Sequence, residues 1–221
     1  MVDFGGVLTT SLRTNAEEFE RSAGLAPGAY RAALAHPAGA RVYADLETGR
    51  AAQRDWNEVI GGLLGIETEN LMGRVLGPLR LEDQVVDAVA AAGASGAVTA
   101  LLSNSFGLEP FNVYAELDLL DLFDVVVLSE REGVRKPDPE IYRRTVGRMG
   151  LAPRRCVFVD DREVNLPPAR SLGIHPLLHT DPTRTASLLS EWFGPQKDMP
   201  AVDPVPPSAT DPTRPEGLER H

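Results

Sequence analysis

The sequence predicts an α/β protein in which a parallel sheet is flanked by helices, with a small helical unit inserted after the first strand. From residue 81 to 192, short apolar runs alternate with stretches of helical spacing, which is the βαβ pattern of a parallel sheet. Residues 13–79 show helical spacing and no strong strand pattern. Several apolar runs end in a small polar or charged residue. This is expected where buried parallel strands end at the carboxyl edge of a sheet, because functional residues of such folds lie at that edge.

The first strand is expected to be unusually short. Only Met1 and Val2 precede Asp3, whereas a strand usually has about five or six residues. A central strand would therefore lack its leading half, and whether Met1 is the natural start stays open.

The elements that follow can be placed in order along the chain. In the inserted unit, helices are expected at 15–23 and 54–64. Pro139 suits the first turn of a later helix, and Gly150 and Gly173 suit helix ends. The remaining expected elements are a helix at 81–92, a strand at 98–102, a helix after residue 109, a strand at 123–128, a helix from 136 to 149, a strand at 156–159, a helix at 165–172, a strand at 174–178 and a helix at 183–192.

Composition and charge narrow the function classes. The chain of 221 residues carries a formal net charge of −10, with 43% hydrophobic and 24% charged residues. Nucleic acids and anionic membranes require clustered Lys and Arg, so the acidic balance favours a small-molecule substrate and argues against both partners. The chain has no apolar run of the ~20 residues needed to span a bilayer and no charged-then-apolar leader, which predicts a cytoplasmic protein. The single Cys156 is interpreted as a packed strand residue.

The last part of the sequence differs from the rest. Residues 194–221 are rich in Pro, Asp, Ser and Thr and contain few apolar side chains. Such a segment cannot bury enough surface to offset its ordering entropy. We expect a disordered, Pro-rich tail.

Four segments carry the candidate chemistry, in a fixed order along the chain. Asp3 and Gly5 follow the first short strand, Ser103 and Asn104 follow the second, Lys136 precedes Pro-Asp-Pro, and Asp160 and Asp161 end a fourth apolar run. Two adjacent buried carboxylates would repel each other, and a bound divalent cation with oxygen ligands resolves that repulsion. The same cation would offset the charges of an attacking carboxylate and a phosphate. The residues thus predict a Mg²⁺ site.

Together these four segments resemble the haloacid dehalogenase (HAD)-like hydrolase superfamily, in its subfamily IA form with a helical cap and an Asp-x-Gly-Gly first motif. The resemblance implies a Rossmann-like core made of residues 1–12 and 80–193, with a cap at 13–79. It implies a magnesium-dependent phosphatase with Asp3 as the nucleophile and Lys136 as a catalytic residue. Ser103, Asn104 and Lys136 would bind the substrate phosphate.

The resemblance also implies a metal-ligand set. Asp3, Asp161 and the backbone carbonyl of Gly5 would bind Mg²⁺, and Asp160 would act directly or through a water. Asn165, four residues after Asp161, could orient that carboxylate or a metal-bound water, or could simply cap a helix.

Gly5 departs from the family pattern, because relatives usually have there a second aspartate that moves protons. A positioned acid or base contributes ~10²- to 10⁴-fold, so three interpretations stay open. The substrate could have a good leaving group, as in a sugar 1-phosphate or acyl phosphate; Asp3 could attack carbon, as in a haloacid dehalogenase; or the domain could be a silent phosphate-ligand or partner-binding module. The first is favoured.

Glu47 and Arg50 are expected to lie in the cap. Arg50 is interpreted as a solvated residue at a helix end rather than as a substrate contact.

Overall fold

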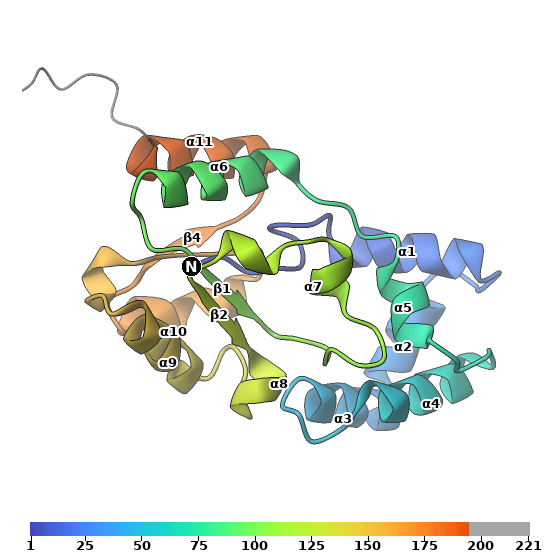
Figure 1. Cartoon of the computed structure of the whole chain (residues 1–221). Helices are drawn as coiled ribbons and strands as arrows, with labels where there is room; N and C mark the ends of the chain where they lie inside the picture. The colour runs from blue at the N-terminus through green and yellow to red at the C-terminus, as the bar shows by residue number, and fades with distance from the viewer. Residues whose placement is uncertain (195–221) are drawn as a thin grey trace, which may run out of the picture.

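Four short parallel strands form the sheet in the computed structural model, which describes residues 1–194 (Figure 1). The pairs β1–β2 and β3–β4 are both parallel, and Val2 forms parallel bridges to Leu101 of β1 and to Val159 of β3. The order across the sheet is therefore β2, β1, Val2, β3 and β4. The strand bounds are Ala100–Ser103 (β1), Val125–Leu128 (β2), Val157–Asp160 (β3) and His175–Leu178 (β4). The predicted α/β class with a parallel sheet is confirmed.

The segment before Asp3 occupies the centre of the sheet, although it is too short to form a strand of its own. The Val2 amide donates to the Ala100 carbonyl at 2.9 Å, and the Val2 carbonyl accepts from the Leu102 amide at 2.9 Å. On the other side, the Asp3 amide donates to the Val159 carbonyl at 2.9 Å. These bonds fix Asp3 at the point where the central segment leaves the sheet.

Two apolar clusters cover the two faces of the sheet. Because successive side chains of a strand point to opposite faces, Leu101 and Val159 belong to one cluster, and Leu102 and Phe158 belong to the other. The first face is covered by α6 and α11 and the second by α9 and α10, as Figure 1 shows. The bounds are Asp83–Ala94 (α6), Pro139–Met149 (α9), Leu166–Ser171 (α10) and Pro182–Phe193 (α11).

Five helices lie between the first segment and α6, gathered at one side of the sheet (Figure 1). We call residues 12–76 the helical segment. Ser11 caps its first helix by accepting from the Thr14 amide at 3.1 Å, and Pro37 occupies the first turn of its third. The helices are Leu12–Ser22 (α1), Ala29–Ala35 (α2), Pro37–Leu46 (α3), Gln53–Leu64 (α4) and Leu71–Leu76 (α5).

The stretch after β1 is irregular before the next helix begins. Ser103 is the last residue of β1, and the next helix, α7 (Val113–Glu116), begins only after an irregular segment at 104–112. Gly107 has φ +76° and Pro110 has no amide hydrogen, so this segment does not continue as a helix. The predicted helix after residue 109 is confirmed as α7, so no helix N-terminus lies directly after Ser103.

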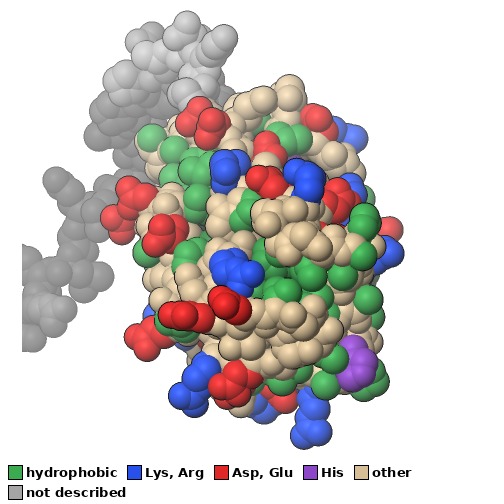
Figure 2. All heavy atoms as spheres, turned by 90° about the vertical axis from the view of Figure 1, so that its right-hand side faces the viewer, with side chains coloured by type: hydrophobic (Ala, Val, Ile, Leu, Met, Phe, Trp, Pro, Cys, Tyr) green, Lys and Arg blue, Asp and Glu red, His purple; other side chains and the backbone are tan. Residues whose placement is uncertain are grey.

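The surface of the helical segment carries charges of both signs (Figure 2). On the face that carries the helical segment, acidic and basic side chains are interspersed and neither sign dominates (Figure 2). Within residues 1–194, no helix is both long and apolar enough to cross a lipid bilayer. The predicted tail at 194–221 lies, apart from Gly194, outside the described residues.

Candidate active site

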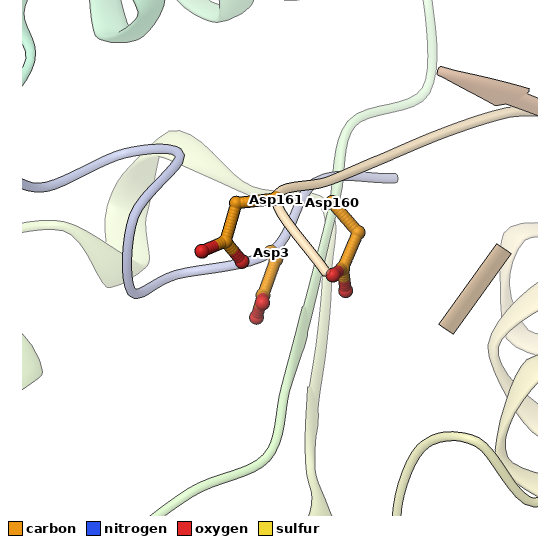
Figure 3. Close-up of side chains that lie close together, drawn as sticks. All are labelled: Asp3, Asp160 and Asp161. Atoms are coloured by element: carbon orange, nitrogen blue, oxygen red, sulfur yellow. The ribbon is translucent and has the colours of Figure 1, made fainter. Parts of the chain in front are cut away.

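Three carboxylates meet at the carboxyl edge of the sheet. Asp3 leaves the central segment, Asp160 ends β3 and Asp161 follows it, and one oxygen of each lies within 4.8 Å of the others. Asp3 and Asp160 are buried, whereas Asp161 is exposed. Figure 3 shows their side chains gathered where the two chain segments leave the sheet. The structure thus brings together three of the residues that the sequence singles out.

Lys136 lies between two of these carboxylates. Its Nζ is 2.6 Å from Asp3 Oδ1 and 2.8 Å from Asp160 Oδ2, and it donates to the Leu102 carbonyl at 2.9 Å. The side chain is fully buried and its ammonium lies 5.4 Å from the centre of the Phe158 ring. A buried ammonium with three fixed acceptors is a preorganised positive charge beside Asp3.

The two oxygens of Asp3 have different surroundings. Oδ1 accepts from the Phe4 amide at 2.7 Å and contacts Lys136, while no donor within residues 1–194 bonds to Oδ2. Burial raises the pKa of Asp3 to about 7; Lys136 opposes the shift and the nearby Asp160 adds to it. One oxygen is therefore held in place and the other is left available for reaction.

The raised pKa predicts how the stability of the metal-free protein depends on pH. Between its ordinary pKa near 3.8 and its folded value near 7, Asp3 binds more proton in the folded state than in the unfolded state. Its contribution to the free energy of unfolding therefore falls as pH rises from about 4 to 7. In chelator, urea unfolding across this range is expected to show wild type losing stability relative to Asp3→Asn. A difference between the two proteins that does not vary with pH would contradict this assignment.

Asp160 is held by four contacts. Asn165 Nδ2 donates to both of its oxygens, at 2.9 and 3.0 Å, the Arg162 amide donates to Oδ1 at 2.8 Å, and Lys136 contacts Oδ2. Asn165 was expected to orient Asp161 or a metal-bound water, or to cap a helix. It is the N-cap residue of α10, and its amide donates to Asp160 rather than to Asp161.

Two glycines shape the loop after Asp3. Gly6 has φ +81°, and a Cβ there would lie 2.6 Å from Asp161 Oδ2, so a side chain would collide with a candidate metal ligand. Gly5 lines the cavity described below, and a Cβ on it would lie 3.0 Å from the Leu12 side chain. The side chain missing at position 5 is thus replaced partly by Leu12 from α1.

Ser103 and Asn104 contact neighbouring residues of the site. The Ser103 hydroxyl is 2.8 Å from the Tyr114 hydroxyl. Asn104 accepts from the Lys136 amide at 2.8 Å and donates to the Lys136 carbonyl at 3.0 Å. The Asn104 side chain therefore positions the backbone of Lys136, and phosphate binding by Ser103 or Asn104 stays a prediction.

A cavity of about 430 Å³ opens over Asp3. The cavity lies between the sheet edge and the helical segment. Its volume is suited to a small ligand. Sequence reasoning missed several of its side chains, since nothing in their local pattern separates them from surface residues. The missed lining residues include Arg13, Tyr43, Glu47, Phe106 and Arg162. Arg50, by contrast, bonds to Asp45 at 2.8 Å and is not among the lining residues.

The site thus combines a carboxylate cluster with a buried lysine at the carboxyl edge of a parallel sheet, where open α/β folds bind their ligands. The family model for haloacid dehalogenase-like hydrolases matches residues 1–173, and the chain belongs to this family. Among solved structures, the magnesium complex of a HAD family enzyme from Bacteroides thetaiotaomicron has a TM-score of 0.63 and 21% identity. The match covers 80% of this chain and 90% of that one, which supports the fold.

Curated relatives match over shorter stretches. The chain is 37% identical over 110 residues to mouse acyl-CoA dehydrogenase family member 10, covering 50% of this chain and 10% of the relative. It is 41% identical over 59 residues to flavin mononucleotide hydrolase 1 of Arabidopsis thaliana, covering 27% of this chain and 24% of the relative. The matched parts are therefore at most a quarter of these relatives' lengths.

Proposed function

We propose that the protein hydrolyses the phosphomonoester of a small metabolite, with Mg²⁺ as cofactor and an aspartyl-phosphate on Asp3 as intermediate. The observation that carries this proposal is the geometry of Asp3. One of its oxygens is fixed by Lys136 and the Phe4 amide, the other is unbonded within residues 1–194, and the residue lines a cavity of about 430 Å³. A carboxylate held in this way is suited to nucleophilic attack.

The residues fit a magnesium ion. Mg²⁺ binds through one or two carboxylates and keeps several waters, and the oxygens of Asp3, Asp160 and Asp161 lie within 4.8 Å of one another. Asn165 Oδ1 is buried without a partner among the described residues, which leaves an acceptor beside Asp160. In our proposal Asp3, Asp161 and the Gly5 carbonyl hold the ion, and Asp160 acts directly or through a water. When bound, the ion would offset the negative charges of the carboxylates and the phosphoryl group.

The protein's own groups would carry the first step. Asp3 Oδ2 attacks phosphorus, a bond forms between them, and the bond from phosphorus to the leaving oxygen breaks. The leaving oxygen keeps the bonding electron pair, departs as an anion and takes its proton from solvent. Lys136 keeps Asp3 oriented and offsets charge that builds up beside it. We further propose that Ser103 and Asn104 help to bind the phosphate, and that residues 13–79 act as a cap on a core of residues 1–12 and 80–193.

The substrate class follows from charge and size. The net charge of −10 and the interspersed surface charges favour a small phosphorylated molecule over nucleic acid or an anionic membrane. The missing side chain at Gly5 favours a good leaving group, as in a sugar 1-phosphate or an acyl phosphate. The name of the flavin mononucleotide hydrolase adds that nucleotide to the candidates.

Phosphate release from a substrate panel tests this function. The panel contains sugar phosphates, nucleotides including flavin mononucleotide, acyl phosphates and an activated aryl phosphate, each with Mg²⁺ and with excess chelator. We expect release that requires Mg²⁺, falling at least ~10²-fold in chelator because three carboxylates are then left without their cation. Halide release from 2-haloacids in chelator would favour the dehalogenase alternative, and a folded protein without any turnover would favour a silent binding module.

A further inference from the structure

Hydrolysis of an aspartyl-phosphate needs a group that accepts a proton from the attacking water. This inference rests on the proposed function. Gly5 has no side chain for the task, although it lines the cavity next to Asp3. A proton acceptor, if the chain has one, must come from another element that reaches the cavity.

The side chains around the cavity leave one candidate. Three lining residues are carboxylates, namely Asp3, Asp161 and Glu47, and the first two are already assigned to attack and to metal binding. Arg13, Arg162 and Lys136 are cations and offer no acceptor. Burial raises the pKa of Tyr43, which keeps its phenol protonated at neutral pH. Glu47 is therefore the carboxylate that the first step does not use.

Glu47 belongs to the helical segment, where it is the C-cap residue of α3. The residue is 2% exposed, and its Oε2 forms an ion pair with Arg135. Arg135 directly precedes Lys136, whose ammonium contacts Asp3 at 2.6 Å. The ion pair thus connects Glu47 to the segment whose Lys136 contacts the proposed nucleophile Asp3.

The other oxygen of Glu47 remains available. No donor within residues 1–194 bonds to Oε1, although the residue is buried and lines the cavity. A buried carboxylate is costly unless it is paired, and Arg135 supplies the pair through Oε2 alone. An anchored carboxylate that lines the cavity and keeps one oxygen unbonded within residues 1–194 has the arrangement of a general base.

We propose that Glu47 is the general base of the dephosphorylation step. Oε1 accepts one proton from a water while the water oxygen forms a bond to phosphorus. The bond between phosphorus and the Asp3 oxygen breaks, and its electron pair returns to the Asp3 carboxylate. Inorganic phosphate leaves, and Glu47 then passes the proton to solvent.

Pre-steady-state kinetics of Glu47→Gln distinguish this role from a structural ion pair. With an activated aryl phosphate and Mg²⁺, the first step needs no proton donor, so the variant should release about one equivalent of aryl alcohol per active site in a burst. Steady-state turnover should then be ~10²-fold or more below wild type, within the range for a general base, because the phosphoenzyme accumulates. Loss of turnover without a burst, or unchanged turnover, would overturn the proposal.

Two further variants complete the test. Asp45→Asn is a matched control, because Asp45 is a carboxylate of the same helix that pairs with Arg50 and is not among the lining residues; it should behave as wild type. Glu47→Asp keeps the carboxylate but shortens the side chain by one methylene. Its steady-state turnover after the burst should therefore fall less below wild type than that of Glu47→Gln. If Glu47→Gln fails to fold, a phosphoenzyme lifetime in Glu47→Asp equal to that of wild type would overturn the proposal. A wild-type protein without Mg²⁺-dependent release would instead refute the proposed function itself.

Discussion

Asp3→Asn is expected to abolish phosphate release while the protein stays folded. An amide oxygen is a poor nucleophile and cannot form the acyl-phosphate bond, so turnover should fall on the order of 10⁴- to 10⁶-fold, as when a nucleophile or its partner is removed elsewhere. The amide has nearly the same shape, and its oxygen can still accept from the Phe4 amide and Lys136, which bond to Asp3 Oδ1 at 2.7 and 2.6 Å. Steady-state phosphate release and thermal unfolding of the same preparation check both parts.

The control for this variant is Asp45→Asn, the same chemical change at an exposed ion pair with Arg50. It should retain wild-type turnover. If Asp3→Asn retains more than a tenth of wild-type turnover in a preparation free of wild-type protein, Asp3 is not the nucleophile.

Lys136→Met is expected to cost both stability and activity. Methionine keeps the length of the side chain but leaves Asp3 and Asp160 without the ammonium that contacts them at 2.6 and 2.8 Å. Removing one partner of a buried ion pair typically costs ~3–5 kcal/mol. Turnover should fall by ~10²- to 10³-fold, the size of a lost preorganised charge.

The stability cost of Lys136→Met should depend on pH. Lys136 lowers the pKa of Asp3, so without it Asp3 binds its proton more readily. At pH 5 the protonated carboxyl needs no counter-charge, whereas at pH 8 two carboxylates face each other. Urea unfolding in chelator should show a larger loss at pH 8 than at pH 5, and added Mg²⁺ should restore part of it. An equal, small loss at both pH values would mean that Lys136 does not support these carboxylates.

Much of the sheet edge could be predicted from the sequence, because periodicity and strand-end residues are local signals. Asp3, Asp160 and Asp161 each follow a short apolar run, and the parallel topology places such ends at one edge. The helices at 15–23 and 54–64 were also readable from spacing, and the structure has α1 and α4 there. The separate helices α2 and α3 were not, since α2 has only seven residues and α3 begins at Pro37, directly after the cap residue His36.

The partners of the site residues could not be read from the sequence. The Asn104 side chain hydrogen-bonds to the Lys136 backbone, and the Tyr114 hydroxyl contacts the Ser103 hydroxyl. The Asn165 amide donates to Asp160 rather than to Asp161. Each contact joins residues whose relative placement depends on the turn or loop between them. The pair between Glu47 and Arg135 spans 88 positions, so no local signal in the sequence points to it.

Trapping the covalent intermediate tests whether Asp3 forms an aspartyl-phosphate during turnover. Enzyme mixed with a radiolabelled acyl or aryl phosphate and Mg²⁺ would be quenched in acid at short times and mapped by peptide mass spectrometry. We expect label on the peptide that contains Asp3, released by neutral hydroxylamine and absent from Asp3→Asn. Turnover with label on another residue, or a burst of leaving group with no label on the protein, would contradict it.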